Sequence, residues 1–188
     1  AQLDSAKLQA AASLLAERGV WQTPTLALYN NFATKEYLGD AAMEQLQVLP
    51  PEVSSAWSAA MKMSGTENDP GTMAYADWMR ETVGYLHQHQ VPFMAGTDTP
   101  IGFLIPGLSL HRELELLVQS GLSNMEAIQA ATVEPAKFLG VEQQTSRILE
   151  GYEADLLLLR ENPLEGISAT KEIEVVIKAG KVVSREEF

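Results

Sequence analysis

The stretch Val91-Pro92-Phe93-Met94-Ala95-Gly96-Thr97-Asp98-Thr99-Pro100 decides the fold of this 188-residue chain. Its first residues are apolar and predict a short strand that stops at Asp98, within a turn rich in Gly, Thr and Pro. In a parallel barrel, catalytic side chains lie where the strands end and the interior opens. Asp98 is therefore a candidate catalytic carboxylate. The alternative is an aspartate whose side chain only caps a turn or a helix.

Helical and extended patterns alternate before this strand. Residues 4–18 have the apolar spacing of a helix, and Gly19 follows them as a C-cap candidate. We expect a first strand over residues 20–28 and several helical pieces over residues 36–90, interrupted by the turn-rich segment 65–71. The order helix, strand, helix, strand implies parallel strands joined by right-handed crossovers.

The pattern changes from helical to strand-like near residue 147. A helix is predicted over residues 109–119, and the capping box Ser123-Asn124-Met125-Glu126 begins another. Further on, Leu156–Leu159 is typical of a buried strand, and residues 172–183 predict two more strands joined by a turn. We expect these strands to be antiparallel and to pack beside the preceding layer.

Composition excludes several classes of function. The formal net charge of −12 argues against nucleic acid or anionic lipid as a partner, because both require basic surfaces. No apolar run approaches the roughly 20 residues of a membrane span, so we expect a soluble protein. The absence of cysteine excludes disulfides and thiolate metal ligands. The first residues, Ala1-Gln2-Leu3-Asp4, show no signal peptide, and no compartment is predicted.

The order of the motifs resembles the C-terminal part of the amidohydrolase superfamily, in particular its imidazolonepropionase- and prolidase-like branch. The resemblance starts from Asp98 at a strand end. It continues through Ser109-Leu110-His111-Arg112-Glu113-Leu114, Glu126-Ala127, Ala130-Ala131-Thr132, Pro135-Ala136, Leu139-Gly140, Gly151-Tyr152-Glu153-Ala154-Asp155-Leu156 and Gly180-Lys181-Val182-Val183.

The resemblance implies an α/β fold in two parts. Residues 1–147 would supply strands seven and eight, with their helices, of a (β/α)8 TIM-like barrel. Residues 148–188 would form the C-terminal part of a small β-sandwich. A whole barrel takes about 250 residues, so we expect this chain to pair with the missing N-terminal part of the barrel or with another copy of itself.

The resemblance also implies a chemistry. It predicts metal-dependent hydrolysis of an amide-type C–N bond in a dipeptide or a cyclic amide, with Asp98 as a ligand of a divalent metal, zinc, and as the acceptor of a proton from metal-bound water. The other ligands of the family have no counterpart that can be assigned, so we expect the chain alone to be inactive. The alternative is a non-catalytic binding or assembly module with the same fold.

Two other residues are candidates for substrate contacts. His111 lies near the predicted barrel mouth, where it would line a substrate pocket or make a helix-terminal contact; both interpretations are open. Tyr29 follows the first strand, and either its hydroxyl meets the substrate or its ring packs beneath the 30–85 segment, which the pattern favours. The His87-Gln88-His89 pair has metal-ligand spacing, but it precedes the strand that ends at Asp98, so we expect a solvated helix C-terminus there.

The remaining charged candidates are predicted to be structural. Glu113 and Glu115 are typical of solvated helix charges, and Asp155 resembles a turn-setting residue of the family. Thr25 and Thr97, at the strand ends, are also expected to be structural.

Overall fold

The computed structural model describes residues 5–64 and 69–183. The elements of this part, in chain order, are α1 (Ser5–Glu17), α2 (Leu26–Thr34), η1 (Glu36–Leu38), α3 (Asp40–Gln45), η2 (Leu46–Val48), α4 (Pro51–Met63), α5 (Pro70–Gln88), η3 (Ile101–Phe103), α6 (Leu108–Gln119), α7 (Asn124–Ala130), α8 (Val133–Leu139), β1 (Leu156–Leu159), η4 (Ile167–Lys171), β2 (Ile173–Lys178) and β3 (Lys181–Val183). Among the described residues, we find no helix whose length and apolar character would suit a membrane crossing.

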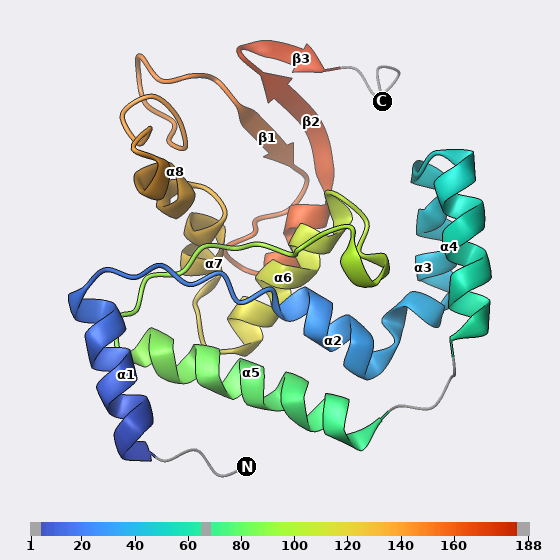
Figure 1. Ribbon diagram of the computed structural model, residues 1–188. Coiled ribbons are helices and arrows are strands. Elements are labelled where there is room, and N and C mark those ends of the chain that lie inside the picture. The colour runs from blue at the N-terminus through green and yellow to red at the C-terminus, as the bar shows by residue number, and fades with distance from the viewer. Residues whose placement is uncertain (1–4, 65–68, 184–188) are drawn as a thin grey trace.

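The main core lies between α2, α5 and α6. Leu26 of α2, Val83 of α5, and Leu116 and Leu117 of α6 are all buried there. Figure 1 shows the long α5 beneath α2 and α6, with the three strands at the far side of the helical layer. The predicted helix over residues 4–18 is confirmed as α1, which buries Ala12 in the same core.

The two predicted parallel strands are reduced to one bridge. Gln22 pairs with Phe93 in parallel orientation, through bonds from the Gln22 amide to the Pro92 carbonyl and from the Met94 amide to the Gln22 carbonyl, both 2.9 Å. The parallel arrangement is thus confirmed, but a strand over the whole of residues 20–28 is wrong, because the chain is helical from Leu26 onward. Proline has no amide hydrogen to donate to a ladder, and Pro24 and Pro92 flank this bridge.

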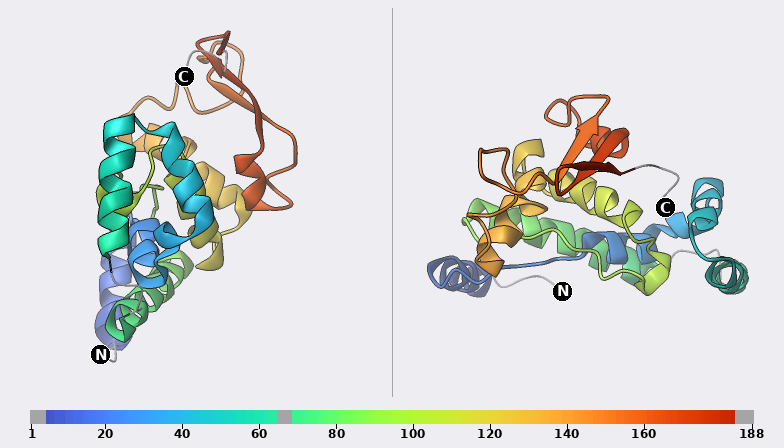
Figure 2. Two further views of the ribbon diagram at one scale, coloured as in Figure 1. Left: turned by 90° about the vertical axis from the view of Figure 1, so that its right-hand side faces the viewer. Right: turned by 90° about the horizontal axis from the view of Figure 1, so that it is seen from above.

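The C-terminal strands form an antiparallel sheet in the order β1-β2-β3, as predicted. The predicted burial of Leu156–Leu159 is wrong: Leu157 and Leu158 are 55% and 46% exposed. None of the residues in the three strands is buried by the described part of the chain. Both views in Figure 2 show the reason, since the sheet stands off the helical layer and no described element covers its outer face.

The segment between α2 and α5 forms the predicted helical pieces and a second, smaller core. Tyr37, Leu46 and Met61 come together with Ile105, which follows η3. Proline begins two of these helices: Pro51 is the first residue of α4 and Pro70 the first of α5, where its missing amide hydrogen costs nothing. The part of the predicted turn at 65–68 lies outside the described residues.

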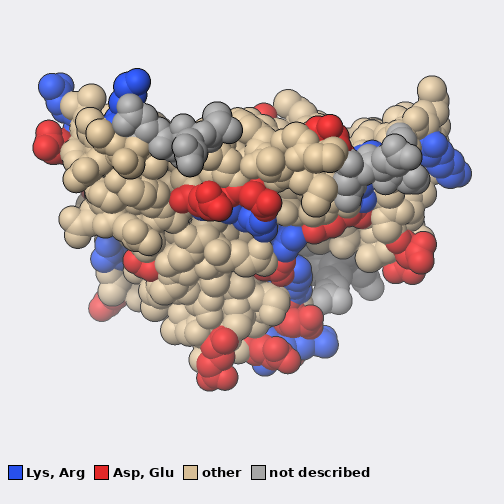
Figure 3. Space-filling model, turned by 90° about the horizontal axis from the view of Figure 1, so that it is seen from below, with Lys and Arg blue, Asp and Glu red and all other residues tan. Residues whose placement is uncertain are grey.

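Charged side chains are mixed on the face of the molecule seen from below. Figure 3 shows acidic groups there with basic groups close to several of them, separated by broad uncharged areas. This face offers none of the continuous basic surface that phosphate backbones require. The net charge of −12 also disfavours a nucleic-acid partner.

Candidate functional site

Asp98 lies in the turn that follows the parallel bridge at Phe93, but the predicted strand does not extend to it, because residues 94–98 are not in a strand. Its side chain is exposed, and its backbone has a φ of 56°, an unusual value for a residue other than glycine. Its carbonyl accepts a 3.1 Å hydrogen bond from the Ile101 amide, which closes the turn into η3. The main chain therefore holds Asp98 in a defined turn, and its carboxylate faces solvent in the described chain.

The loop after Asp98 is tied closely to α2. The buried Asn31 donates a 2.7 Å hydrogen bond from Nδ2 to the Gly102 carbonyl. Gly102 has a φ of +64°, and a Cβ at this position would lie 2.7 Å from Cδ1 of Leu28. The positive φ favours glycine here, and a larger residue would also have to move the side chain of Leu28. The position of the Asp98 loop is thus fixed by a helix that lies 71 residues away in sequence.

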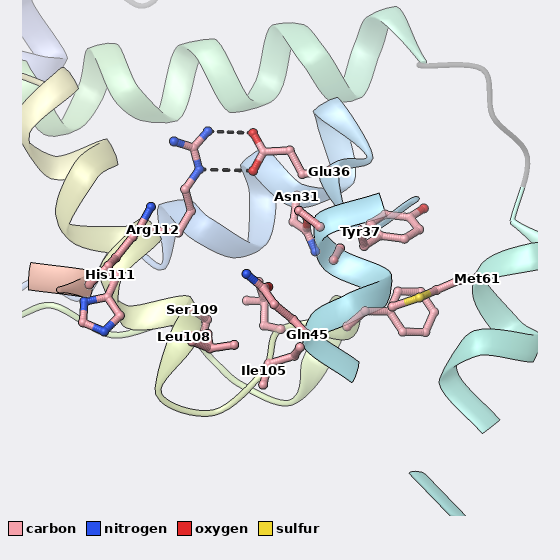
Figure 4. A pocket seen from close by; sticks show the side chains of 15 residues that line it. Asn31, Glu36, Tyr37, Gln45, Met61, Ile105, Leu108, Ser109, His111 and Arg112 are labelled. Carbon is pink, nitrogen blue, oxygen red and sulfur yellow. Dashed lines mark hydrogen bonds and ion pairs between the residues drawn. The ribbon is translucent and has the colours of Figure 1, made fainter. Parts of the chain in front are cut away.

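A cavity of about 500 Å³ opens beside this loop, within the size range of small-molecule sites. One wall is apolar and comes from the smaller core, with Tyr37, Met61 and Ile105. The opposite wall carries His111 and Arg112 of α6. Figure 4 shows His111 and Arg112 on one side of the space and Tyr37 and Met61 on the other, with Asn31 and Gln45 between them. Asp98 does not belong to the lining, but the segment that follows it does.

His111 of the lining is held by Thr170 of η4. Its Nδ1 lies 3.0 Å from the Thr170 hydroxyl, which itself donates a 2.8 Å hydrogen bond to the Ile167 carbonyl. A hydroxyl has one hydrogen to donate, so Nδ1 must carry the hydrogen in the His111–Thr170 bond. The pKa of His111 is lowered first by burial and then by the Lys171 ammonium, although Glu115 opposes this. The lowered pKa favours the neutral imidazole, and in that form the hydrogen on Nδ1 makes Nε2 an acceptor.

Arg112 is fixed by two carboxylates. It forms a fork with Glu36 of η1, with bonds of 3.2 Å from Nε and 2.7 Å from Nη2, and a third bond of 3.1 Å to Glu115. Lys171 of η4 pairs with Glu115 as well. Two cations and two carboxylates therefore compensate one another along the polar wall. The solvated position predicted for Glu115 is wrong, because its side chain is only 16% exposed within this network.

Glu113, also predicted to be a solvated helix charge, is fully buried. Its Oε2 accepts a 2.6 Å hydrogen bond from the Ala27 amide, and the Leu26 amide contributes a second. These are the first amides of α2. The N-cap residue, Thr25, has a left-handed backbone conformation, and its side chain makes no capping hydrogen bond. Glu113 therefore caps α2 from another helix. Burial raises the pKa of Glu113 to about 7, although the two backbone bonds oppose this.

Sequence reasoning missed Glu113, although a signal existed. Glu113 lies three residues after Leu110 and four before Leu117, on the apolar stripe of α6. A charged residue on such a stripe needs a buried partner. The buried oxygen Oε1 has no described partner.

Tyr29 does not join the cavity. Its ring packs edge-to-face on Tyr75 of α5, with centroids 5.2 Å apart, which agrees with the packing interpretation. The histidines of the His-x-His pair lie at the C-terminal end of α5, as predicted. His87 is 3.6 Å from Glu126, and the ring of His89 stacks on Tyr85.

Two turn residues behave as the sequence suggests. Asp155 accepts a hydrogen bond from the Ala179 amide at 2.8 Å and pairs with Lys178, so it holds the β2–β3 turn. Thr97 is buried and accepts a 3.3 Å hydrogen bond from Ser109 of α6. Both contacts are structural.

A metal ion would find too few ligands in the described part of the chain. No three His, Cys, Asp or Glu side chains come together within residues 5–64 and 69–183, whereas a catalytic zinc takes about three protein ligands. The residues present therefore do not fit a complete metal site. Asp98 offers one carboxylate.

Known proteins are similar to this chain in sequence and in fold. The ochratoxinase of Aspergillus niger is 38% identical over 97 residues, which are 49% of this chain and 19% of that protein. The imidazolonepropionase of Vibrio cholerae is 34% identical over 98 residues, 47% of this chain and 23% of that protein. The matched segments thus cover less than a quarter of the length of either curated relative.

Solved structures match over most of the chain. A Xaa-Pro dipeptidase with methionine bound in its active site has a TM-score of 0.67 and 27% identity, and the match covers 93% of this chain and 37% of that one. A proposed prolidase from Bifidobacterium longum has a TM-score of 0.62 and 28% identity over 88% of this chain and 35% of its own. These likenesses imply a fold of the TIM-barrel type. The model of the amidohydrolase family matches residues 4–183, and the chain therefore belongs to the amidohydrolase family.

Proposed function

We propose that this chain forms part of a hydrolase that cleaves amide-type C–N bonds in small molecules, such as dipeptides or cyclic amides. The observation that carries the proposal is the position of Asp98, in the turn that follows the parallel bridge at Phe93 in a chain of the amidohydrolase family. Barrel enzymes place catalytic side chains at this end of their strands. The relatives named as an imidazolonepropionase and a Xaa-Pro dipeptidase support the class of bond.

Asp98 has two proposed roles. It is one ligand of a divalent metal, which we propose to be zinc, and it accepts a proton from the attacking water. A divalent ion, when bound, supplies a water molecule whose pKa lies near neutrality. The exposed position of the Asp98 carboxylate supports this assignment, because a ligand must reach an ion shared with other segments.

The rest of the site would come from outside this chain's described residues. We propose that residues 1–147 supply two strands of a barrel and residues 148–188 part of a small β-sandwich. The other barrel strands would come from a missing N-terminal part or from a second copy of the chain. The exposed apolar residues Leu157, Leu158 and Val182 of the C-terminal sheet support a covering partner, since exposed apolar strand faces favour association.

His111 and Tyr29 are the proposed substrate contacts. The cavity position and free Nε2 of His111 support its role. Tyr29 would need to act through its hydroxyl, because its ring is engaged by Tyr75. The competing function is a non-catalytic binding or assembly module, which the lack of a three-residue metal cluster in the described chain leaves open.

The test is turnover in the complete protein. Asp98→Ala should lower kcat for dipeptide or cyclic amide hydrolysis by orders of magnitude and leave the chain folded, because the side chain is exposed, although alanine adopts the positive φ of this position less readily than aspartate. Asp77→Ala, at an exposed aspartate of α5, is the matched control. The 188-residue chain alone, supplied with zinc, should not exceed a metal-only blank. Near wild-type turnover of Asp98→Ala would refute the proposal.

A further inference from the structure

The cavity beside the Asp98 loop has a chemical preference that can be derived from its two walls. Its apolar wall is continuous, because Tyr37, Met61 and Ile105 belong to one buried cluster and Phe103 packs against it. The Tyr37 and Phe103 rings lie with centroids 5.0 Å apart. Such a wall is suited to an aromatic or branched aliphatic group.

The polar wall has no unpaired cation among the described residues. Arg112 is engaged by Glu36 and Glu115, and Lys171 by Glu115. A carboxylate that entered the cavity would have to displace one of these two glutamates or lie close to it. Since like charges repel and the existing pairs would be lost, the wall disfavours an anionic group.

His111 supplies the specific polar contact. Because its Nδ1 hydrogen is used by Thr170, Nε2 of the neutral imidazole is an acceptor. A group that bonds to Nε2 of His111 must therefore present an N–H or O–H. The charged groups around His111, namely Arg112, Lys171, Glu36 and Glu115, are paired with one another, so no described carboxylate is free to hold an imidazolium.

We propose that this cavity binds the uncharged apolar arm of an amide substrate, with the amide N–H donating to Nε2 of His111 and the arm resting on the Tyr37–Met61–Ile105 wall. The assignment rests on the proposed amide hydrolysis and narrows its substrate class: the group bound here carries no carboxylate. The loop that leads from Asp98 to α6 lines the cavity, so a bound arm lies next to the segment that carries Asp98.

Binding to the 188-residue chain tests this without any turnover. The probes are N-acetyl-phenylalaninamide, the free acid N-acetyl-phenylalanine, and N-acetylglycinamide, which lacks the apolar arm. Calorimetry, with chemical-shift mapping of the His111 and Ile105 signals, should detect the phenylalaninamide with a dissociation constant on the order of 1 mM. The acid and the glycinamide should each bind at least several-fold more weakly.

Three variants separate the possible causes. His111→Phe keeps a ring but removes the acceptor, so affinity should fall about three- to ten-fold, as expected for one hydrogen bond. His87→Phe, outside the cavity, is the matched control and should bind as the wild type does. Asp98→Ala should also bind normally, which keeps this test independent of the proposed function.

A spectroscopic readout covers the case in which His111→Phe does not fold. Nitrogen-15 shifts of the wild-type imidazole should show the hydrogen on Nδ1, and Thr170→Val should abolish this preference and weaken probe binding. Tighter binding of the acid, unchanged affinity in His111→Phe or Thr170→Val, or no binding of the amide at millimolar concentration would each overturn the proposal.

Discussion

Glu113→Gln should change how the stability of the chain depends on pH. Burial raises the pKa of Glu113 from 4.5 to about 7, and its side chain is fully buried. A difference of that size between folded and unfolded chains corresponds to about 3 kcal/mol. The folded state retains the proton between these two values and the unfolded state does not, so the free energy of unfolding falls as pH rises through this window.

The free energy of unfolding that Glu113 removes is zero below its pKa in the unfolded chain and reaches its full value above its pKa in the folded chain. Between pH 5 and pH 8, Glu113 should therefore lower the free energy of unfolding by about 2 kcal/mol. Glutamine has nearly the same shape, can accept the Ala27 amide hydrogen and does not titrate. The loss between pH 5 and pH 8 should thus be about 2 kcal/mol smaller in Glu113→Gln than in the wild type, whatever the variant's absolute stability.

Urea unfolding at several pH values between 5 and 8 measures this difference. Contributions from other groups, such as the lowered pKa of His111, which acts in the opposite direction, are shared by both proteins and cancel. Glu81→Gln, at an exposed position of α5, is the control, because it leaves Glu113 and the charges around His111 in place. Parallel curves for the wild type and Glu113→Gln would refute the assignment of a buried, proton-retaining carboxyl.

Two further predictions concern helix packing and capping. Gly84→Ala should destabilise the chain by about 1–3 kcal/mol in urea unfolding, because the new Cβ would lie 2.4 Å from the Ser120 carbonyl oxygen. The control is Gly166→Ala, where the atom nearest to the new Cβ would be 3.9 Å away. An equal loss of stability in both variants would contradict the clash. Ser123→Ala should cost about 1 kcal/mol in the same assay, because it removes the hydroxyl of an intact capping box at α7; a change within measurement error would mean that the box does not stabilise α7.

Sequence reasoning was most successful where the signal is local. Gly19 after α1 and the capping box at Ser123 act within a single helical turn, and both helix ends lie where the sequence predicts them. The position of Asp98 after an apolar segment also follows from neighbouring residues alone. The family motifs are likewise short and ordered along the chain, so the resemblance and the family match agree.

The candidate site could be predicted only in part. His111 was a candidate from its position, and the structure places it in the cavity. Its hydrogen-bond state was not predictable, because Thr170 is 59 residues away. The role of Asp98 stays a prediction, since the other ligands of a metal are not among the described residues.

The sequence by itself determined the extent of α1, the start of α7, the antiparallel pairing of the C-terminal strands, and which family the motifs resemble. Only the tertiary structure decided that α2 begins at Leu26 under the carboxylate of Glu113, and that Leu157 and Leu158 remain exposed. The physical reason is that capping and turn signals act between residues close in the chain. Burial, pKa and cavity shape depend instead on which distant segments pack together, and an apolar run is buried only where another element covers it.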